Sequence, residues 1–237
     1  MKLSVVIPSY NEQSRLPQTL LEAQSWLDEH FPKSYEILVV DDGSEDQTCA
    51  EVIRIQNQLG VLQLLRLEQN TGKGAAVRKG MLAARGDIIV YMDADHSTHI
   101  REITKAIDAI AKGADVVIAS RRHPQSQIPR HQSWLRENMG RTFRSLMYAV
   151  VNLEFQDTQC GFKAFTYKST QQLFTRQRLN GFSFDVELLY IAKKLGLTVQ
   201  EIPVCWINEP NSRVRMIVDP LRMFLDITRI SNLHKDL

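Results

Sequence analysis

The chain has 237 residues, of which 43% are hydrophobic and 24% are charged, and its formal net charge is +2. This composition is typical of a globular protein and excludes a fibrous or disordered chain, and the charge is too small to indicate nucleic-acid binding. No apolar run reaches the length of a transmembrane helix. The three cysteines, Cys49, Cys160 and Cys205, are too scattered for a disulfide framework or a C-x-x-C metal site. We therefore expect one domain over residues 1–237, in a reducing compartment such as the cytoplasm.

In the first half of the chain, short apolar runs alternate with amphipathic segments of helical length. This is the pattern of βαβ units, and it predicts an α/β fold with a mainly parallel sheet flanked by helices. Strands are expected near residues 3–7, 36–40, 61–66, 88–92 and 115–119. Helices are expected from Pro17 onward, after "DDGSEDQT", and over about 74–84 and 100–112. Ser44 and Gln47 have the spacing of a capping box, so we expect Ser44 to cap the second helix.

The second half alternates less regularly. Residues 121–144 contain six arginines against one acid, Glu137, which suits either a solvated face or a surface that meets phosphate or lipid headgroups. Two further strands are expected near 162–166 and 199–206, with a helix at about 184–195 between them. The C-terminal segment 218–233 is amphipathic, and it predicts a helix that either packs on the core or lies on a membrane.

Two carboxylates, Asp93 and Asp95, follow the strand expected at 88–92. Aspartates in this position are often only turn formers. The alternative is a metal site, because Mg²⁺ and Mn²⁺ prefer oxygen ligands and a cation bound to a diphosphate needs only one or two protein carboxylates. His96 and His99 follow, but a hard cation favours oxygen over imidazole, so we expect neither histidine to be a ligand.

Polar turns also follow the other strands expected in the first half: "PSYNE" at 8–12, "DDGS" at 41–44 and "NTGKG" at 70–74. In an open parallel sheet, ligands bind outside the carboxyl ends of the strands. Tyr10 offers a ring to a base, Asp41 or Asp42 can accept hydrogen bonds from a base or a ribose, and Lys73 can meet phosphate. The chain has neither a G-x-G-x-x-G after the first strand nor a P-loop, so this edge predicts a nucleotide diphosphate site of another kind.

Taken in order, "VVIPSYNE", "VVDDGSEDQT", "NTGKGAAVRKGM" and "YMDADHST" resemble the inverting family 2 glycosyltransferases with the GT-A fold. The resemblance continues through "DTQCGFKAF", "FSFDVELLYIAKKLG" and "EIPVCWINEPNSRV". This later half is most similar to the dolichyl-phosphate (polyprenyl-phosphate) β-glucosyltransferases, with dolichyl-phosphate mannosyltransferases next. The resemblance implies an enzyme whose Rossmann-like residues 1–120 bind a sugar nucleotide and whose residues 121–237 bind the acceptor.

The same resemblance implies roles for individual residues. Asp93 and Asp95 would hold Mg²⁺ or Mn²⁺ on the donor diphosphate, and Ser97 stands where some relatives offer a further ligand. Asp157 occupies the position often assigned to the catalytic base, and Asp95 and Arg121 are the other catalytic candidates. The residues expected to bind the sugar nucleotide are Pro8, Tyr10, Glu12, Val40, Asp41, Asp42, Lys73, Asp93, Ala94, Arg121 and Arg213.

The implied reaction moves a hexose, glucose from UDP-glucose, to a polyprenyl or dolichyl phosphate, with peripheral contact at the cytoplasmic face of a membrane. An acceptor phosphate is already an anion and needs no strong base, so Asp157 could instead hold a sugar hydroxyl or orient the acceptor. Asp185 and Glu187 could face the sugar or cap their helix. The alternatives are a GDP-mannose donor, a soluble family 2 transferase with a saccharide or protein acceptor, and a non-catalytic binding module, against which intact Asp93, Asp95 and Asp157 argue.

Overall fold

The computed structural model of the chain describes residues 1–130, 150–208 and 218–237. Seven strands form one sheet in the order β3-β2-β1-β4-β7-β5-β8, and a second sheet pairs β6 with β9. The strands are β1 (Leu3–Ser9), β2 (Tyr35–Asp41), β3 (Leu62–Arg66), β4 (Ile88–Met92), β5 (Val116–Ser120), β6 (Gln127–Arg130), β7 (Phe162–Thr166), β8 (Val199–Pro203) and β9 (Cys205–Ile207).

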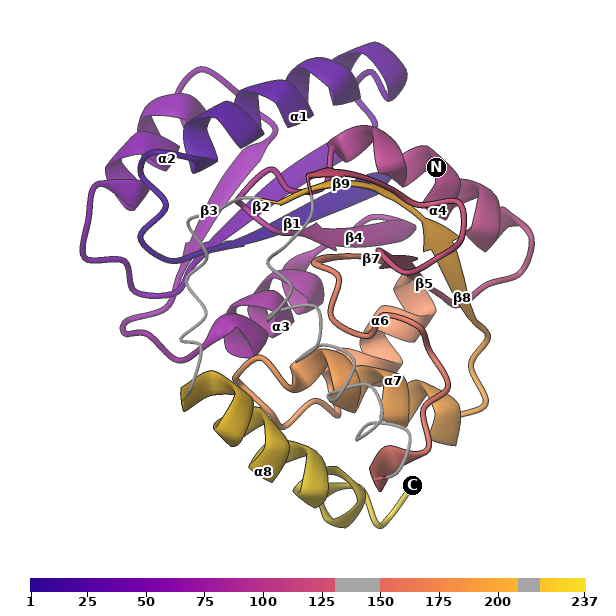
Figure 1. Ribbon diagram of the computed structural model, residues 1–237. Coiled ribbons are helices and arrows are strands. Elements are labelled where there is room, and N and C mark those ends of the chain that lie inside the picture. The colour runs from indigo at the N-terminus through magenta and orange to yellow at the C-terminus, as the bar shows by residue number, and fades with distance from the viewer. Residues whose placement is uncertain (131–149, 209–217) are drawn as a thin grey trace.

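Helices cover both faces of the large sheet (Figure 1). One face carries α1 (Leu16–His30), α2 (Thr48–Gln56), the 3₁₀ turn η1 (Ile100–Glu102) and α4 (Ile103–Ala111). The other face carries α3 (Lys73–Ala83), α6 (Tyr167–Phe174), α7 (Phe184–Lys194) and α8 (Val218–Leu233).

Two apolar cores follow from the alternation of side chains along the strands. Val5 and Ile7 of β1 lie in the core beneath α1, α2 and α4, whereas Val6 lies in the core shared with α3, α6, α7 and α8. Because both faces of the central strands are buried, these strands read as continuous apolar runs in the sequence.

Strand β7 gives the sheet its mixed character and shapes the site. It runs antiparallel to both β4 and β5, whereas the other pairs of the large sheet are parallel. Met92 at the end of β4 pairs with Phe162 at the start of β7. The reversal therefore brings residues 157–161 to the edge where the parallel strands β1, β2 and β4 end.

The expected α/β architecture is confirmed, with three corrections. Ser44 does not cap the second helix: its hydroxyl accepts the Asn11 N–H at 2.9 Å, and α2 begins only at Thr48, whose N–H is bonded to Asp46. The strand expected at 199–206 is two strands in different sheets, separated at Val204, whose N–H is bonded to the Ser126 hydroxyl at 2.9 Å. Strand β6 and helix α6 were not expected from the sequence.

The amphipathic C-terminal helix α8 packs on the core and also exposes apolar side chains. Met223, Ile227 and Ile230 are buried against α7, whereas Leu221 and Phe224 are 62% and 41% exposed. Across the described ranges, every helix is too short or too polar to cross a membrane.

Candidate active site

The turn "NTGKG" is held in place by Asp42, at the end of β2. The Asp42 carboxylate accepts the N–H groups of Thr71 and Gly72 at 2.8 and 2.9 Å. Gly72 has φ +114°, and a Cβ on it would lie 2.5 Å from the Asn180 carbonyl oxygen, so the turn needs glycine here. Asp42 was one of two carboxylates expected to accept a hydrogen bond from a base or ribose, and that role stays a prediction. Its two main-chain bonds hold the turn that carries Lys73.

Asp41 lies beside Asp42 at the end of β2. It is fully buried, and its Oδ2 accepts the Ser44 N–H at 3.0 Å and lies 3.6 Å from Arg66 Nε. Its Oδ1 has no hydrogen-bond partner among the described residues. Burial and the neighbouring Asp41 carboxylate raise the pKa of the Cys49 thiol to about 11. A buried acceptor without a partner is costly, so Asp41 is the better candidate to receive a hydrogen bond from the nucleotide.

The first turn, "PSYNE", is fastened to the "DDGSE" turn of residues 41–45 by Asn11, which sequence reasoning did not single out. Asn11 has φ +54°, its N–H is bonded to Ser44, and its Oδ1 accepts the Glu45 N–H at 2.9 Å. Tyr10 is half-buried beside this junction. Glu12 is bonded to the Arg15 side chain, with Nε at 2.6 Å, so its carboxylate secures the start of α1. Pro8 and Val40 are buried and pair in register on β1 and β2, where they support the pocket.

The two metal-candidate aspartates follow β4, and Lys73 reaches across to the first of them. Lys73 Nζ lies 2.6 Å from Asp93 Oδ1, and the two side chains are 22% and 28% exposed. Burial raises the pKa of Asp93, and the charges of Asp95 and Asp185 raise it further against the opposing effect of Lys73. Carboxylates in excess over cations, with oxygen as the donor atom, fit a divalent metal ion.

The loop that carries these aspartates is clamped through its main chain. The Asp93 N–H donates to the Gly161 carbonyl at 2.9 Å, and the Ala94 carbonyl accepts the Thr19 hydroxyl of α1 at 2.9 Å. Asp95 Oδ1 accepts the Ser97 N–H at 3.0 Å. Ala94 thus spaces the two carboxylates and anchors them to α1.

Asp157 is bonded to Arg121 rather than left open to act as a base. Arg121 Nε and Nη2 lie 2.6 and 2.9 Å from the two carboxylate oxygens, and the Arg121 N–H also donates to Oδ2 at 3.0 Å. Burial alone would raise the pKa of Asp157, but Arg121 outweighs it and lowers this pKa to about 2. The guanidinium also lies over the Trp206 ring at 5.4 Å. Asp157 therefore stays ionised at neutral pH and is a weak proton acceptor.

Lys163, which sequence reasoning did not single out, forms a buried polar group with Asp185 and Tyr91. Lys163 of β7 is 1% exposed and donates to Asp185 Oδ1 at 2.6 Å and to the Cys160 carbonyl at 2.8 Å. The Tyr91 hydroxyl also donates to Asp185 Oδ1. Burial and the charge of Asp185 raise the pKa of Tyr91 well above its ordinary value, which keeps it a donor. The only sequence signal was a lysine inside the apolar run "GFKAF".

Residues 4–174 match the family described as glycosyl transferase family 2. The chain belongs to this family. It is similar to the dolichyl-phosphate beta-glucosyltransferase of Dictyostelium discoideum, with 36% identity over 96% of this chain and 73% of the relative. The proteins of the same name from Saccharomyces cerevisiae and Homo sapiens are 35% and 33% identical, over 96% and 95% of this chain and 73% and 74% of the relatives.

Solved structures agree with this family 2 glycosyltransferase in fold. The glucosyl-3-phosphoglycerate synthase of Mycobacterium tuberculosis superposes with a TM-score of 0.71 at 19% identity, over 98% of this chain and 80% of that protein. A structure of the same synthase with Mn²⁺, UDP and phosphoglyceric acid gives a TM-score of 0.70 at 20% identity, over 98% of this chain and 78% of the synthase. The expected GT-A fold and the assignment as a glycosyltransferase are confirmed.

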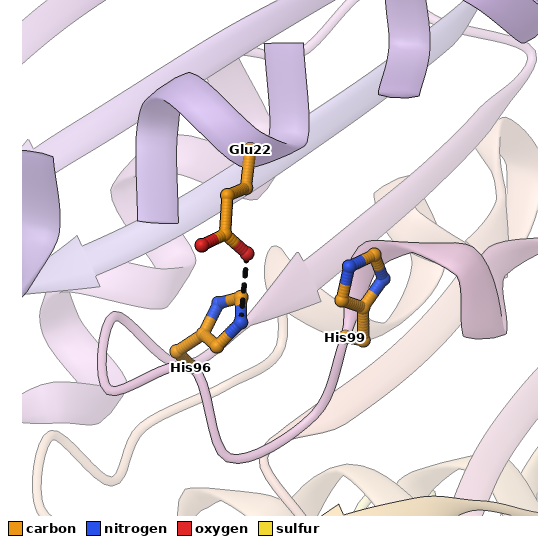
Figure 2. A group of neighbouring side chains, drawn as sticks. All are labelled: Glu22, His96 and His99. Atoms are coloured by element: carbon orange, nitrogen blue, oxygen red, sulfur yellow. Dashed lines mark ion pairs between the residues drawn. The ribbon is translucent and has the colours of Figure 1, made fainter. Parts of the chain in front are cut away.

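His96 and His99, in the loop after Asp95, lie close to Glu22 of α1 (Figure 2). His96 Nε2 lies 2.8 Å from Glu22, and candidate ligand atoms of Glu22, His96 and His99 lie within 4.8 Å of one another. His99 Nδ1, however, accepts the Arg101 N–H at 3.1 Å, which places the proton of the neutral ring on Nε2. A metal at Nε2 of His99 would require the other tautomer. This geometry therefore favours a polar contact between α1 and the loop over a metal site.

Asp185 and Glu187 neither cap α7 nor act alike. Asp185 faces Lys163 and Tyr91, whereas buried Glu187 accepts the N–H groups of Arg178 and Leu179, each at 2.9 Å, and pairs with His234 of α8. Arg213 and residues 131–144 of the basic segment 121–144 lie outside the described residues, so their predicted roles stay predictions.

Proposed function

We propose that this family 2 enzyme transfers glucose from UDP-glucose to a polyprenyl phosphate, of which dolichyl phosphate is one, with inversion at the anomeric carbon. The names of the relatives, which are 33–36% identical over nearly the whole chain, support glucose as the sugar and a dolichyl phosphate as the acceptor. The UDP complex of the structural neighbour is consistent with a uridine nucleotide.

The observation that carries the proposal is the pairing of Asp157 with Arg121. An alcohol acceptor must lose a proton during transfer and needs a base, whereas a phosphate acceptor is already ionised. With a pKa lowered to about 2, Asp157 is unsuited to take that proton. The site therefore fits an anionic nucleophile, whose phosphate oxygen attacks the anomeric carbon on the face opposite the departing UDP.

Asp93 and Asp95 would hold the divalent ion, Mg²⁺ or Mn²⁺, which when bound neutralises the charge of the donor diphosphate. Lys73 would bind the diphosphate from the turn that Asp42 shapes, adding positive charge where the leaving group develops its negative charge. Asp41 and Tyr10 would bind the nucleoside. Arg121, fixed by Asp157 and Trp206, would orient the phosphates without needing to move.

The decisive experiment incubates purified protein with UDP-glucose, MgCl₂ or MnCl₂ and a detergent-dispersed polyprenyl phosphate, and measures both released UDP and glucosyl lipid. We expect glucosyl lipid that depends on the metal ion and on the phosphate of the lipid. GDP-mannose and the parent polyprenol serve as matched controls. Mannosyl lipid in place of glucosyl lipid, or efficient transfer to the uncharged alcohol, would overturn the proposal.

We further propose that the enzyme meets the cytoplasmic face of a membrane through α8. Leu221, Phe224 and Leu225 are exposed, and the exposed Arg222 and Arg229 lie among them, a combination suited to an anionic lipid surface. The buried residues of the same helix already anchor it to α7.

Phe224→Ser tests this contact, because it removes an exposed ring without disturbing the buried face of α8. Without the Phe224 ring, the helix would bury less apolar surface in the lipid, at a cost of about 1–2 kcal/mol of binding free energy. Binding to phosphatidylserine vesicles should therefore weaken roughly tenfold. Vesicle co-sedimentation measures this effect. Ile53→Ser is the control, since Ile53 is comparably exposed but lies on α2, on the other face of the sheet. Equal binding of the Phe224→Ser variant and the unchanged protein would contradict the proposal.

A further inference from the structure

Lys73 has a backbone held by its neighbours and a side chain that reaches Asp93. Its main chain begins α3, where Asp42 holds Gly72 and where Asn180 carbonyl oxygen accepts the Ala75 N–H at 3.2 Å. Its ammonium group lies on Asp93, the carboxylate that the proposed function assigns to the metal ion. A lysine in this position neutralises the charge that a divalent cation would otherwise neutralise, so the two compete for one carboxylate.

The carboxylate of Asp185 is a second candidate partner for Lys73. Burial alone would lower the pKa of Lys73, but the charge of Asp93 and then that of Asp185 raise it. The hydrogen bonds that Asp185 receives, from Lys163 and from Tyr91, both end on Oδ1. Its Oδ2 receives none within the described part of the chain. The first turns of α3 and α7 pack together, since a Cβ on Gly74 would lie 2.8 Å from Phe184 Cβ. Asp185, the residue after Phe184, therefore offers an open oxygen near Lys73, the residue before Gly74.

The surroundings hold Asp185 in place and set a positive charge beside it. Lys163 Nζ, at 2.6 Å, supplies a buried positive charge that is itself fixed by the Cys160 carbonyl. Asp185 also lies in the first turn of α7, where the N-terminal end of the helix favours negative charge. Lys163 is 1% exposed, and its Nζ is bonded to both Asp185 and the Cys160 carbonyl.

We propose that Lys73 is an internal counter-ion that exchanges partners: it rests on Asp93 until a divalent cation takes that carboxylate, and then turns to Asp185. Asp185 is thus a positioning residue, which holds the displaced ammonium group beside the donor phosphates. The inference rests on the proposed metal role of Asp93, but it makes a statement about cation binding that needs neither donor nor acceptor.

The test is a double-mutant cycle on Mn²⁺ binding, followed by the electron paramagnetic resonance signal of free Mn²⁺ in the absence of donor and acceptor. Lys73→Gln removes the competitor and should tighten Mn²⁺ binding severalfold. Asp185→Asn leaves Lys73 with Asp93 as its remaining partner and should weaken Mn²⁺ binding roughly tenfold. In the Lys73→Gln background, Asp185→Asn should change Mn²⁺ affinity by less than about threefold.

Lys79→Gln is the matched control, because Lys79 is an exposed lysine of the same helix whose Nζ donates to the Arg66 carbonyl at 2.6 Å, and it should leave Mn²⁺ affinity unchanged. An equal loss from Asp185→Asn in both backgrounds would assign Asp185 a general or structural role and overturn the exchange. If Asp185→Asn does not fold because Lys163 loses its partner, Lys73→Gln alone decides: weaker Mn²⁺ binding overturns the proposal. Failure of glucosyl transfer to lipid would leave this binding result intact, so the two proposals fail separately.

Discussion

The two ion pairs at the active edge are built differently. Lys73 and Asp93 share one contact of 2.6 Å, both side chains are partly exposed, and the pKa of Asp93 is raised by burial and by neighbouring carboxylates. Arg121 and Asp157 share two side-chain contacts and a main-chain hydrogen bond, and the pKa of Asp157 is lowered to about 2. The carboxylates around Asp93 thus outnumber their positive partners and can bind a cation. The charge of Asp157, by contrast, is neutralised by Arg121, so Asp157 is a poor proton acceptor.

Asp93→Asn removes the Lys73–Asp93 ion pair and should have the largest effect on activity. Loss of a metal ligand at the leaving diphosphate should lower the transfer rate at least about 10³-fold, equivalent to about 4 kcal/mol. The free energy of unfolding at neutral pH should change little, because a carboxyl whose pKa is raised in the folded state gains no stability from being ionised. Initial rates at saturating metal and urea unfolding measure the two effects.

Asp108→Asn is the control for that variant, since Asp108 is an exposed residue of α4 away from the sheet edge, and it should keep the full rate. Transfer within tenfold of the unchanged enzyme in Asp93→Asn would remove Asp93 from the metal site.

Asp157→Asn removes the Arg121–Asp157 ion pair and should have the largest effect on stability. The lowered pKa of Asp157, about 2, corresponds to about 2 kcal/mol of stability at neutral pH, and this variant should lose that amount. Because the folded pKa lies below the unfolded one, the contribution is complete above about pH 4 and is lost as pH falls toward 2. Chemical unfolding of the two proteins across this range should therefore give curves that converge near pH 2.

A parallel difference at every pH would show that the ionised pair does not supply this stability. Asp108→Asn again serves for comparison, and its unfolding free energy should follow that of the unchanged protein at all pH values, since no described residue forms an ion pair with it.

The contrast between the pairs also separates what the sequence could predict from what it could not. Asp93, Asp95 and Lys73 each follow an apolar run of a βαβ unit, so their convergence at one edge follows from topology. Asp157 meets Arg121 only because β7 is inserted antiparallel between β4 and β5, and no local pattern reveals that reversal.

Partners of buried groups were equally hidden from sequence reasoning. Asp42 was predicted as a possible contact for a base or ribose, and nothing in the sequence revealed that its carboxylate also holds a main-chain turn 29 residues later. Lys163 reads as an isolated charge in an apolar strand, and its partner Asp185 lies 22 residues further along the chain. Periodicity predicts which face a side chain takes, whereas the choice of hydrogen-bond partner depends on how the turns pack in three dimensions.

The smallest expected effect concerns Gly161, whose lack of a side chain leaves space for the Asp93 carboxylate. A Cβ on Gly161 would lie 1.9 Å from Asp93 Oδ2, so Gly161→Ala must displace the carboxylate although the main-chain bond between the two residues can remain. We expect Mn²⁺ binding to weaken about tenfold, equivalent to about 1.4 kcal/mol, with a change in unfolding free energy below about 1 kcal/mol. Gly181→Ala is the control, because a Cβ there meets nothing within 4 Å. Equal Mn²⁺ affinity in both variants would mean that the position of the Asp93 carboxylate does not limit cation binding. The difference between the Lys73–Asp93 pair and the Arg121–Asp157 pair would then depend on Lys73 alone.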